Sequence, residues 1–140
     1  MILPETIEML VRYAEIWQPI EMCGLLFAGD RFEWCQNTHA DPYHGFEIAH
    51  ADYLHHTALY GEAPWATVHS HPNGPANLSG RDCQLLDALE LVENPMKMVI
   101  VGLNPVQIRV YSKAEGQYHV DWKWDIRPME AKEVWYATNS

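Results

Sequence analysis

Residues 66–82 have the sequence ATVHSHPNGPANLSGRD, in which a short apolar run leads to two histidines and then, past a turn, to a helix start. The run before His69 is apolar and β-branched. It predicts a strand on which His69 and His71 share one face, about 6.5–7 Å apart. Asp82 falls in the first turn of the next helix. Two imidazoles and a carboxylate, with a fourth position left to water, are the ligands of a catalytic zinc. The stretch therefore predicts a strand, a loop and a helix around the metal site of a zinc hydrolase.

Each part of this pattern also has an ordinary structural explanation. Ser79 and Asp82 form the Ser-x-x-acid pattern of a capping box, which stabilises a helix by about 1 kcal/mol. A lone His-x-His on a strand is more often surface polarity or part of a core than a ligand pair. The two explanations are compatible, because a cap would also orient Asp82 toward that helix terminus. The conjunction of both patterns favours a metal site.

Glu21 is the candidate for the base that a metal-bound water needs. It lies at the start of a strand that is otherwise apolar through Phe27. A carboxylate is disfavoured at such a position unless its side chain faces a cleft. The alternative is that Glu21 opens the strand in solvent. Gly24, three residues later, would permit a close backbone approach within the sheet.

Length and composition limit the class of protein. The chain has 140 residues, which suits one domain with a core of its own. Its 9 basic and 19 acidic residues give a formal net charge of −10, the wrong sign for binding nucleic acid. Three cysteines without a Cys-x-x-Cys pair indicate a reducing compartment. The N-terminus lacks a long apolar run, and the longest apolar stretches have strand length. We therefore expect a cytoplasmic protein without a signal peptide, a membrane span or a membrane partner.

The remaining chain alternates helical and strand patterns. Apolar residues at helical spacing predict helices over residues 4–17, 51–59 and 80–92. Strand patterns cover residues 20–28, 31–37, 46–48, 98–103, 106–111 and 117–122. This order predicts an α/β (α+β) fold with a mixed β-sheet flanked by helices. The inward stripes expected on the first and last helices are Ile7, Leu10, Val11, Ala14 and Trp17, and Leu85, Leu86, Leu89 and Val92.

Residues 122–140 differ in character and are predicted to form a C-terminal extension. They contain Trp122, Trp124, Trp135 and Tyr136. Such aromatic residues usually cover a core, whereas an exposed cluster of them would mark a partner surface.

Three motifs together resemble the JAMM, or MPN-plus (JAB), family of zinc metalloproteases. They are Glu21-Met22-Cys23-Gly24, His69-Ser70-His71-Pro72 and Ser79-Gly80-Arg81-Asp82. The family pattern of an acid, a distant His-Ser-His and a later Ser-x-x-Asp is met at every position. The resemblance implies a JAMM/MPN metalloprotease domain over residues 1–121, with a cytidine-deaminase-like sandwich. It also implies zinc (Zn2+) held by His69, His71 and Asp82, Glu21 as general acid/base on the metal-bound water, and Ser79 as an oxyanion-stabilising group in amide hydrolysis.

The stretch from Asn37 to Tyr53 is similar to the compact prokaryotic and phage branch of that family, which includes the protease domains of phage tail assembly proteins. This similarity implies a peptidase or isopeptidase with a protein or peptide substrate. The candidate partners are phage tail proteins or a ubiquitin-like protein, met in the host cytoplasm or the virion.

Two other classes of protein remain open. A non-catalytic MPN-type interaction module would keep zinc for stability or lose it, although such a module has no need of an acid above an open metal site. A different metal hydrolase fits less well, because the deaminase Pro-Cys-x-x-Cys motif is missing and a barrel needs about 250 residues. Among the other histidines, the adjacent His55 and His56 would face different directions on a helix, and His44 or His50 could line the cleft.

Overall fold

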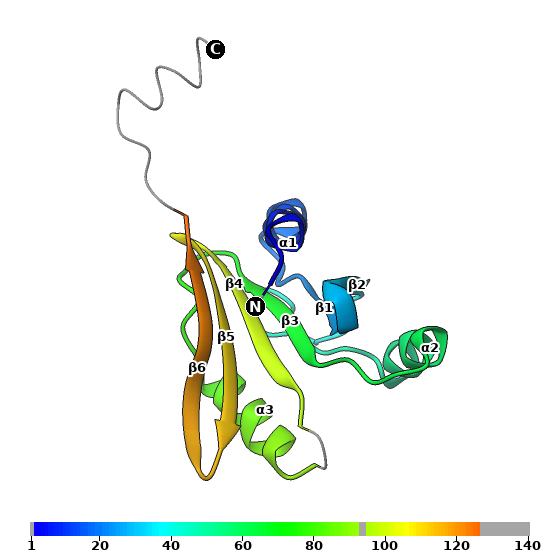
Figure 1. Cartoon of the computed structure of the whole chain (residues 1–140). Coiled ribbons are helices and arrows are strands. Elements are labelled where there is room, and N and C mark those ends of the chain that lie inside the picture. The colour runs from blue at the N-terminus through cyan, green and yellow to red at the C-terminus, as the bar shows by residue number, and fades with distance from the viewer. Residues whose placement is uncertain (1, 93–94, 127–140) are drawn as a thin grey trace, which may run out of the picture.

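The computed structural model describes residues 2–92 and 95–126, which form one sheet with helices on both faces (Figure 1). The six strands lie in the order β2-β1-β3-β4-β5-β6. β3 and β4 are parallel, and the other neighbouring pairs are antiparallel. This architecture confirms the predicted mixed sheet flanked by helices. The strands are β1 (Cys23–Phe27), β2 (Arg31–Cys35), β3 (Ala66–His71), β4 (Lys97–Leu103), β5 (Val106–Ala114) and β6 (Gln117–Asp125).

Helix α1 (Pro4–Trp17) covers one face of the sheet and has the predicted bounds. Proline fits its first turn, where no intrahelical bond is lost. The helix buries part of its predicted stripe against the inward residues of the central strands. Trp17 departs from the prediction, because it is 40% exposed and stacks on Trp34 of β2, with ring centroids 4.9 Å apart. The buried residues of the stripe are Ile7, Leu10 and Ala14.

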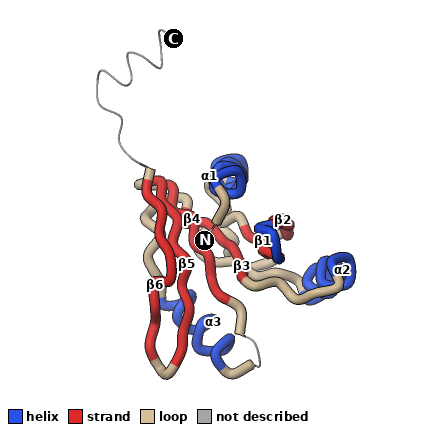
Figure 2. The backbone as a smooth tube through the Cα atoms, viewed as in Figure 1, coloured by secondary structure: helices blue, strands red, loops and turns tan. Residues whose placement is uncertain are grey.

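Helices α2 (His50–Tyr60) and α3 (Gly80–Glu90) lie on the other side (Figure 2). Leu86 of α3 packs with Met98 and Ile100 of β4 in a second, smaller core. The prediction that Val92 faces inward is wrong, because α3 ends at Glu90 and Val92 is 52% exposed. Among the described residues, each helix is too short or too polar to cross a bilayer.

The hairpin of β1 and β2 is shorter than predicted, and its connection is the 3-10 turn η1 (Ala28–Asp30). Gly24 confirms the expected close approach, because a Cβ atom there would overlap the Glu33 carbonyl oxygen and the Phe32 ring. Gly24 thus allows the Phe32 ring to approach β1 closely. The predicted strand over residues 46–48 is reduced to one bridge between Asn37 and Ile48.

The predicted domain boundary after residue 121 falls inside β6, which continues to Asp125. Trp122 and Trp124 pack against the core under α1, in line with the core-covering explanation for such residues. Trp135 and Tyr136 of the predicted extension lie outside the described residues.

Candidate metal centre

Strand β3 carries the two predicted histidines to one face at the centre of the sheet. β3 pairs with β1 on one side and β4 on the other, so its residues are enclosed on both flanks. The His69 side chain has no exposed surface, and that of His71, at the strand end, is 18% exposed. The alternation of a strand turns Ser70 to the opposite face, where its Oγ accepts a hydrogen bond from the Met22 backbone N–H at 2.8 Å. β3 therefore offers one enclosed imidazole and one that reaches the surface.

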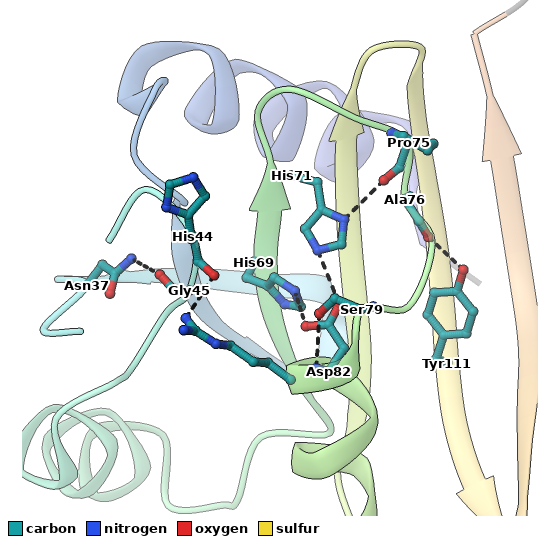
Figure 3. Close-up of polar contacts among 11 residues, drawn as sticks. Asn37, His44, Gly45, His69, His71, Pro75, Ala76, Ser79, Asp82 and Tyr111 are labelled. Atoms are coloured by element: carbon teal, nitrogen blue, oxygen red, sulfur yellow. Dashed lines mark hydrogen bonds and ion pairs between the residues drawn. The ribbon is translucent and has the colours of Figure 1, made fainter. Parts of the chain in front are cut away.

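The first turn of α3 places Asp82 against both histidines. The structure confirms the predicted capping box. Ser79 Oγ accepts a hydrogen bond from the Asp82 backbone N–H at 3.1 Å, and the Ser79 backbone N–H donates to Asp82 Oδ2 at 2.9 Å. The same carboxylate has Oδ1 2.9 Å from His69 Nε2 and Oδ2 3.2 Å from His71 Nε2 (Figure 3). The capping and metal-site explanations thus describe one arrangement, because the cap aims the carboxylate at the imidazoles.

Glu21 lies just before β1 and is buried, with 8% of its surface exposed, so the alternative that it opens the strand in solvent is wrong. Glu21, His69 and His71 each offer one ligand atom, and these three atoms lie within 4.8 Å of one another. Burial raises the pKa of Glu21 to about 7, with Asp82 acting in the same direction and His71 opposing it. Glu21 lies 48 positions before His69 in the sequence, yet it adds to the site a carboxyl group that is about half-ionised near neutral pH.

The protonation of the other three groups follows from burial and mutual contact. Burial lowers the pKa of His69, against the influence of Asp82 beside it. Burial acts in the same direction on His71, but the contacts with Asp82 and the Pro75 carbonyl outweigh it and raise the pKa of His71. Burial disfavours the Asp82 carboxylate, yet its contacts with both histidines hold the pKa of Asp82 well below the usual range. Asp82 is therefore an anion, and His69 is neutral, as metal ligands must be.

The enclosed histidine supplies a test of whether the donors suit a metal ion. The Phe46 ring stacks on His69, with centroids 4.3 Å apart and 16° between the planes. Neither ring nitrogen of His69 has a hydrogen-bond partner among residues 2–92 and 95–126, because the short contact to Asp82 lacks hydrogen-bond geometry. A buried nitrogen lone pair without a partner is costly, and a metal ion would satisfy it. Two imidazoles and a carboxylate are a donor set that zinc accepts, so the residues present fit the ion.

His71 is oriented by the loop that follows it. Its Nδ1 lies 3.0 Å from the Pro75 carbonyl oxygen, which accepts the Nδ1–H and leaves Nε2 facing Asp82 (Figure 3). A backbone carbonyl behind the ligating histidine is a frequent way of fixing the tautomer at metal sites. The loop after β3 therefore orients the His71 ring.

Asn37 joins the Glu21 segment to the loop over the site, a role that the sequence did not reveal. Its side-chain amide donates to the carbonyl oxygens of Glu21 and Gly45, each at 2.9 Å. Its side-chain oxygen accepts from the N–H groups of His39 at 3.0 Å and Glu47 at 3.2 Å. All four bonds of the amide side chain are thus made to backbone, and they fix the residues around Glu21.

Arg81 of α3 binds the same loop, which follows β2. Its guanidinium donates to the His44 carbonyl oxygen at 3.0 Å and lies 3.4 Å from His39 Nε2. Gly45 leaves room for it, because a Cβ atom there would lie 2.5 Å from the Arg81 guanidinium. The signal available in the sequence was weak, since one arginine and one glycine in polar segments have many ordinary uses.

Two of the four candidate groups, Glu21 and Asp82, border a small hollow beside the histidines. The hollow has a volume of about 130 Å³ and is bounded by Glu21, Asp82, Ser79 and Phe46. A wider depression of about 370 Å³ continues from it past His71 along residues 72–79. A carbonyl group placed in the depression could therefore reach the carboxyl of Glu21 and the hydroxyl of Ser79.

Most of the chain matches the model of a known family. The model of prokaryotic homologues of the JAB domain matches residues 4–114. The chain belongs to this family. The JAB match spans α1 to β5 and includes Glu21, both histidines, Ser79 and Asp82.

A solved structure has a similar fold. The chain is similar to protein DSY2949 from Desulfitobacterium hafniense, known from its solution structure, with 21% identity and a TM-score of 0.67. The similarity covers 86% of this chain and 88% of the other, and at this identity it shows the fold alone. No curated protein matches the chain.

The other histidines of this JAB domain stay outside the candidate centre. Among the described residues, the group that could share an ion contains Glu21, His69 and His71, and Asp82 contacts the last two. His44 borders the hollow, as expected, and its Nδ1 contacts Asp41 at 2.9 Å. The rings of His55 and His56 meet edge to face with centroids 5.2 Å apart on α2, away from the JAB motifs.

Proposed function

We propose that this JAB domain is a zinc-dependent peptidase or isopeptidase. One observation carries the proposal: a buried carboxyl from before β1 converges on two histidines of β3 that an aspartate of α3 already contacts. Structural zinc sites are closed by four protein ligands, whereas catalytic sites keep three and leave one position open. Here Glu21 lies beside a set of three candidate ligands, His69, His71 and Asp82, which is the arrangement expected of a catalytic site.

His69 and His71, through Nε2, and Asp82, through its carboxylate, would hold the ion. When bound, zinc lowers the pKa of a coordinated water to about 7 and polarises a carbonyl oxygen. Asp82 and His69 are already in their ligating protonation states, and the third ligand would be His71 in its neutral form. Ligand type favours zinc over magnesium or calcium, which prefer oxygen donors.

Glu21 would act as the general acid/base that moves a proton from the attacking water to the departing amine. A general acid/base works best when its pKa lies near the operating pH, and burial raises the pKa of Glu21 to about 7. Its carboxylate accepts the proton of the attacking water, and the resulting carboxylic acid returns that proton to the nitrogen of the departing amine. The Asn37 side chain and the Pro42 carbonyl, which accepts from the Glu21 N–H at 2.8 Å, hold the backbone that carries this group.

Ser79 would stabilise the oxyanion of the tetrahedral intermediate. Its Oγ accepts a hydrogen bond from the Asp82 N–H, so the hydroxyl proton remains available to donate. The positive end of α3 adds a favourable field for negative charge at this position. Groups of this kind contribute about 3 kcal/mol to transition-state stabilisation.

The substrate would be a protein or peptide chain lying in the depression along residues 72–79. Phage tail proteins and ubiquitin-like conjugates are the candidate substrates, and the host cytoplasm is the proposed place of action. Both are amide-linked chains that a surface depression can admit, and a cleavage panel containing both separates them.

A non-catalytic JAB interaction module is the second candidate. The observation in its favour is that Asp82 already contacts both histidines, so these contacts can hold β3 against α3 without any metal ion. The observation against it is Glu21, because a buried carboxyl with a raised pKa costs folding energy and an interaction module gains nothing from it.

The experiment is a cleavage assay on purified zinc-loaded protein, with ubiquitin-like fusions and phage tail precursors as substrates. The proposal expects cleavage that stops with chelator, returns with zinc and falls at least about a thousandfold in Glu21→Gln. Glu15→Gln, a matched exposed carboxylate on α1, keeps the full rate. Cleavage that survives the chelator or the Glu21 substitution contradicts the proposal. A zinc-loaded protein that cleaves no substrate in the panel supports the interaction module.

A further inference from the structure

An open apolar groove lies between α1 and the end of β6. Its volume is about 560 Å³, and along α1 it runs from Pro4 to Glu15, which is about 17 Å of helix. The other side is lined by Trp122, Trp124 and Ile126. Side chains at alternate positions of a strand share one face, and the two tryptophans pack against the core under α1. We call this feature the α1 groove.

The side chains that line the α1 groove keep apolar surface exposed. Trp122 and Trp124 are half-buried, and Ile126 is 52% exposed. On the α1 side, Val11 lies in the middle part of the groove and is also half-buried. Apolar side chains gathered in one groove mark a binding surface, whereas singly scattered ones do not. An occupant of the groove should therefore bring apolar side chains of its own.

The chain itself leads into this groove. Ile126, the last residue that the structure describes at this end, lines the groove and donates its backbone N–H to the Val106 carbonyl oxygen at 3.1 Å. Residues 127–140 follow from there and contain the run Val134-Trp135-Tyr136. Trp135 comes nine positions after Ile126, a span of about 13 Å in a helix and about 30 Å in an extended chain. Trp135 is therefore within reach of a groove that is about 17 Å long.

Charge favours this segment over a second copy of the chain as the occupant. Residues 127–140 carry two basic and two acidic side chains, so their formal net charge is zero. The rest of the chain has seven of the nine basic and 17 of the 19 acidic side chains, and hence the whole formal charge of −10. Two copies repel each other at this charge, whereas the neutral segment meets no such cost. Its tether to Ile126 also raises its effective concentration at the groove to the order of millimolar.

We propose that residues 127–140 dock in the α1 groove of their own chain, with the Trp135 ring between Val11 and the end of β6. The segment would then complete the core under α1, as aromatic side chains commonly do. This docking site lies on the face of the sheet opposite the metal centre, because Val68, which precedes His69 on β3, packs in the core under α1. The inference is therefore independent of the proposed peptidase function.

The first test locates the segment in the full-length protein by paramagnetic NMR. A nitroxide is attached to Thr138→Cys in a Cys83→Ser background, since Cys23 and Cys35 are buried. We expect loss of amide signal intensity along α1 and at the end of β6, with the signals of α2 and α3 unaffected. Trp135→Ala should restore the intensity along α1. An even loss over the whole surface, or a loss centred on α3 and the metal centre, overturns the proposal.

A mixed sample separates docking within one chain from exchange between two chains. Nitrogen-15-labelled protein without the nitroxide is mixed with unlabelled protein that carries it. Docking within one chain leaves the signals of α1 at full intensity in this mixture. Loss of these signals would show that a second copy supplies the segment, and would overturn the proposed occupant.

The second test measures the contact between Trp135 and Val11 by a double-mutant cycle in urea unfolding of the full-length protein. We expect Trp135→Ala and Val11→Ala each to lower the midpoint, and the effect of Trp135→Ala to be at least about halved in the Val11→Ala background. The matched control is Val120→Ala, because Val120 is 55% exposed on β6 and pairs with Tyr111, which packs in the core on the α3 side. Its effect should add to that of Trp135→Ala. Additive effects with both valines, or an unchanged midpoint in Trp135→Ala, contradict the proposal.

Discussion

The buried carboxyl of Glu21 makes a quantitative prediction about the metal-free protein. Burial raises the pKa of Glu21 from its ordinary 4.5 to about 7, because folding removes water from the charged form. Each unit of pKa corresponds to about 1.4 kcal/mol, so the ionised carboxylate destabilises the folded state by about 3 kcal/mol. Glutamine is nearly isosteric and carries no charge. Glu21→Gln should therefore stabilise the metal-free protein.

The sign of the effect depends on pH. Below pH 4.5 the carboxyl is protonated in both the folded and the unfolded chain, and the substitution gains nothing. Between pH 4.5 and 7 the unfolded chain ionises first, and the penalty on the folded wild type grows. Above pH 7 the penalty is complete. The stability gain of Glu21→Gln should thus be below about 1 kcal/mol at pH 5 and about 3 kcal/mol at pH 8.

The assay is urea unfolding of both proteins at pH 5 and pH 8 with chelator present, followed by tryptophan fluorescence. Asp82, His69 and His71 titrate in both proteins, so the difference in unfolding free energy reports the Glu21 charge together with its effect on the pKa of His71. The exposed Glu15→Gln should change stability by less than about 0.5 kcal/mol at either pH. A gain of the same size at both pH values, or a loss at pH 8, refutes the inference that Glu21 is a desolvated carboxyl.

Three further substitutions test the surroundings of the site. Ser79→Ala should lower the unfolding free energy by about 1 kcal/mol through loss of the helix cap, and should lower kcat of the zinc-loaded protein at least about a hundredfold. A rate that falls only in proportion to the folded fraction would contradict the role of Ser79 in stabilising the oxyanion. Asn37→Ala should lower kcat about tenfold or more with little change in KM, since it loosens the segment that carries Glu21; unchanged kcat in a folded variant would show that this segment is held by other contacts. Gly24→Ala should lower the unfolding free energy by about 2 kcal/mol, measured by thermal unfolding, because the added Cβ atom overlaps its neighbours. Gly74→Ala, where a Cβ atom meets nothing within 4 Å, should change stability little, and equal effects of the two substitutions would contradict the packing explanation.

The parts of the fold that follow from local patterns were predictable from the sequence. The period of a strand places His69 and His71 on one face, and the capping pattern brings Asp82 to the start of a helix. Both statements depend on neighbours within a few residues, and both hold in the structure. The bounds of α1 were predictable for the same reason, because proline, apolar spacing and the following Gln18-Pro19 all act locally.

The parts that depend on distant contacts were not predictable. Trp17 continues the helical stripe of α1 but stacks on Trp34, because its partner is fixed only when β2 folds beside the helix. The length of β6 was underestimated for the same reason, since Trp122 and Trp124 pack against a core that α1 supplies from the other end of the chain. Asn37 offered no signal, because an asparagine at the start of a polar loop looks the same whether or not it binds four backbone groups.

The candidate site shows the same division. The ligand types and their spacing could be derived, whereas the convergence of Glu21 on the two histidines required the pairing of β1 with β3. The stacking of the Phe46 ring on His69 likewise arises from packing across elements. Local sequence therefore indicated the chemistry, and tertiary contacts determine which side chains shape the cavity.

The most direct test of the metal centre is the zinc content of four proteins after equilibrium dialysis, measured by elemental analysis. If His69, His71 and Asp82 are the ligands and Glu21 stands free as the base, the wild type and Glu21→Gln should each retain one zinc per chain. His69→Ala and Asp82→Asn should retain none. Loss of zinc from Glu21→Gln together with its retention in Asp82→Asn would contradict these assignments, as would a wild-type protein that binds no zinc.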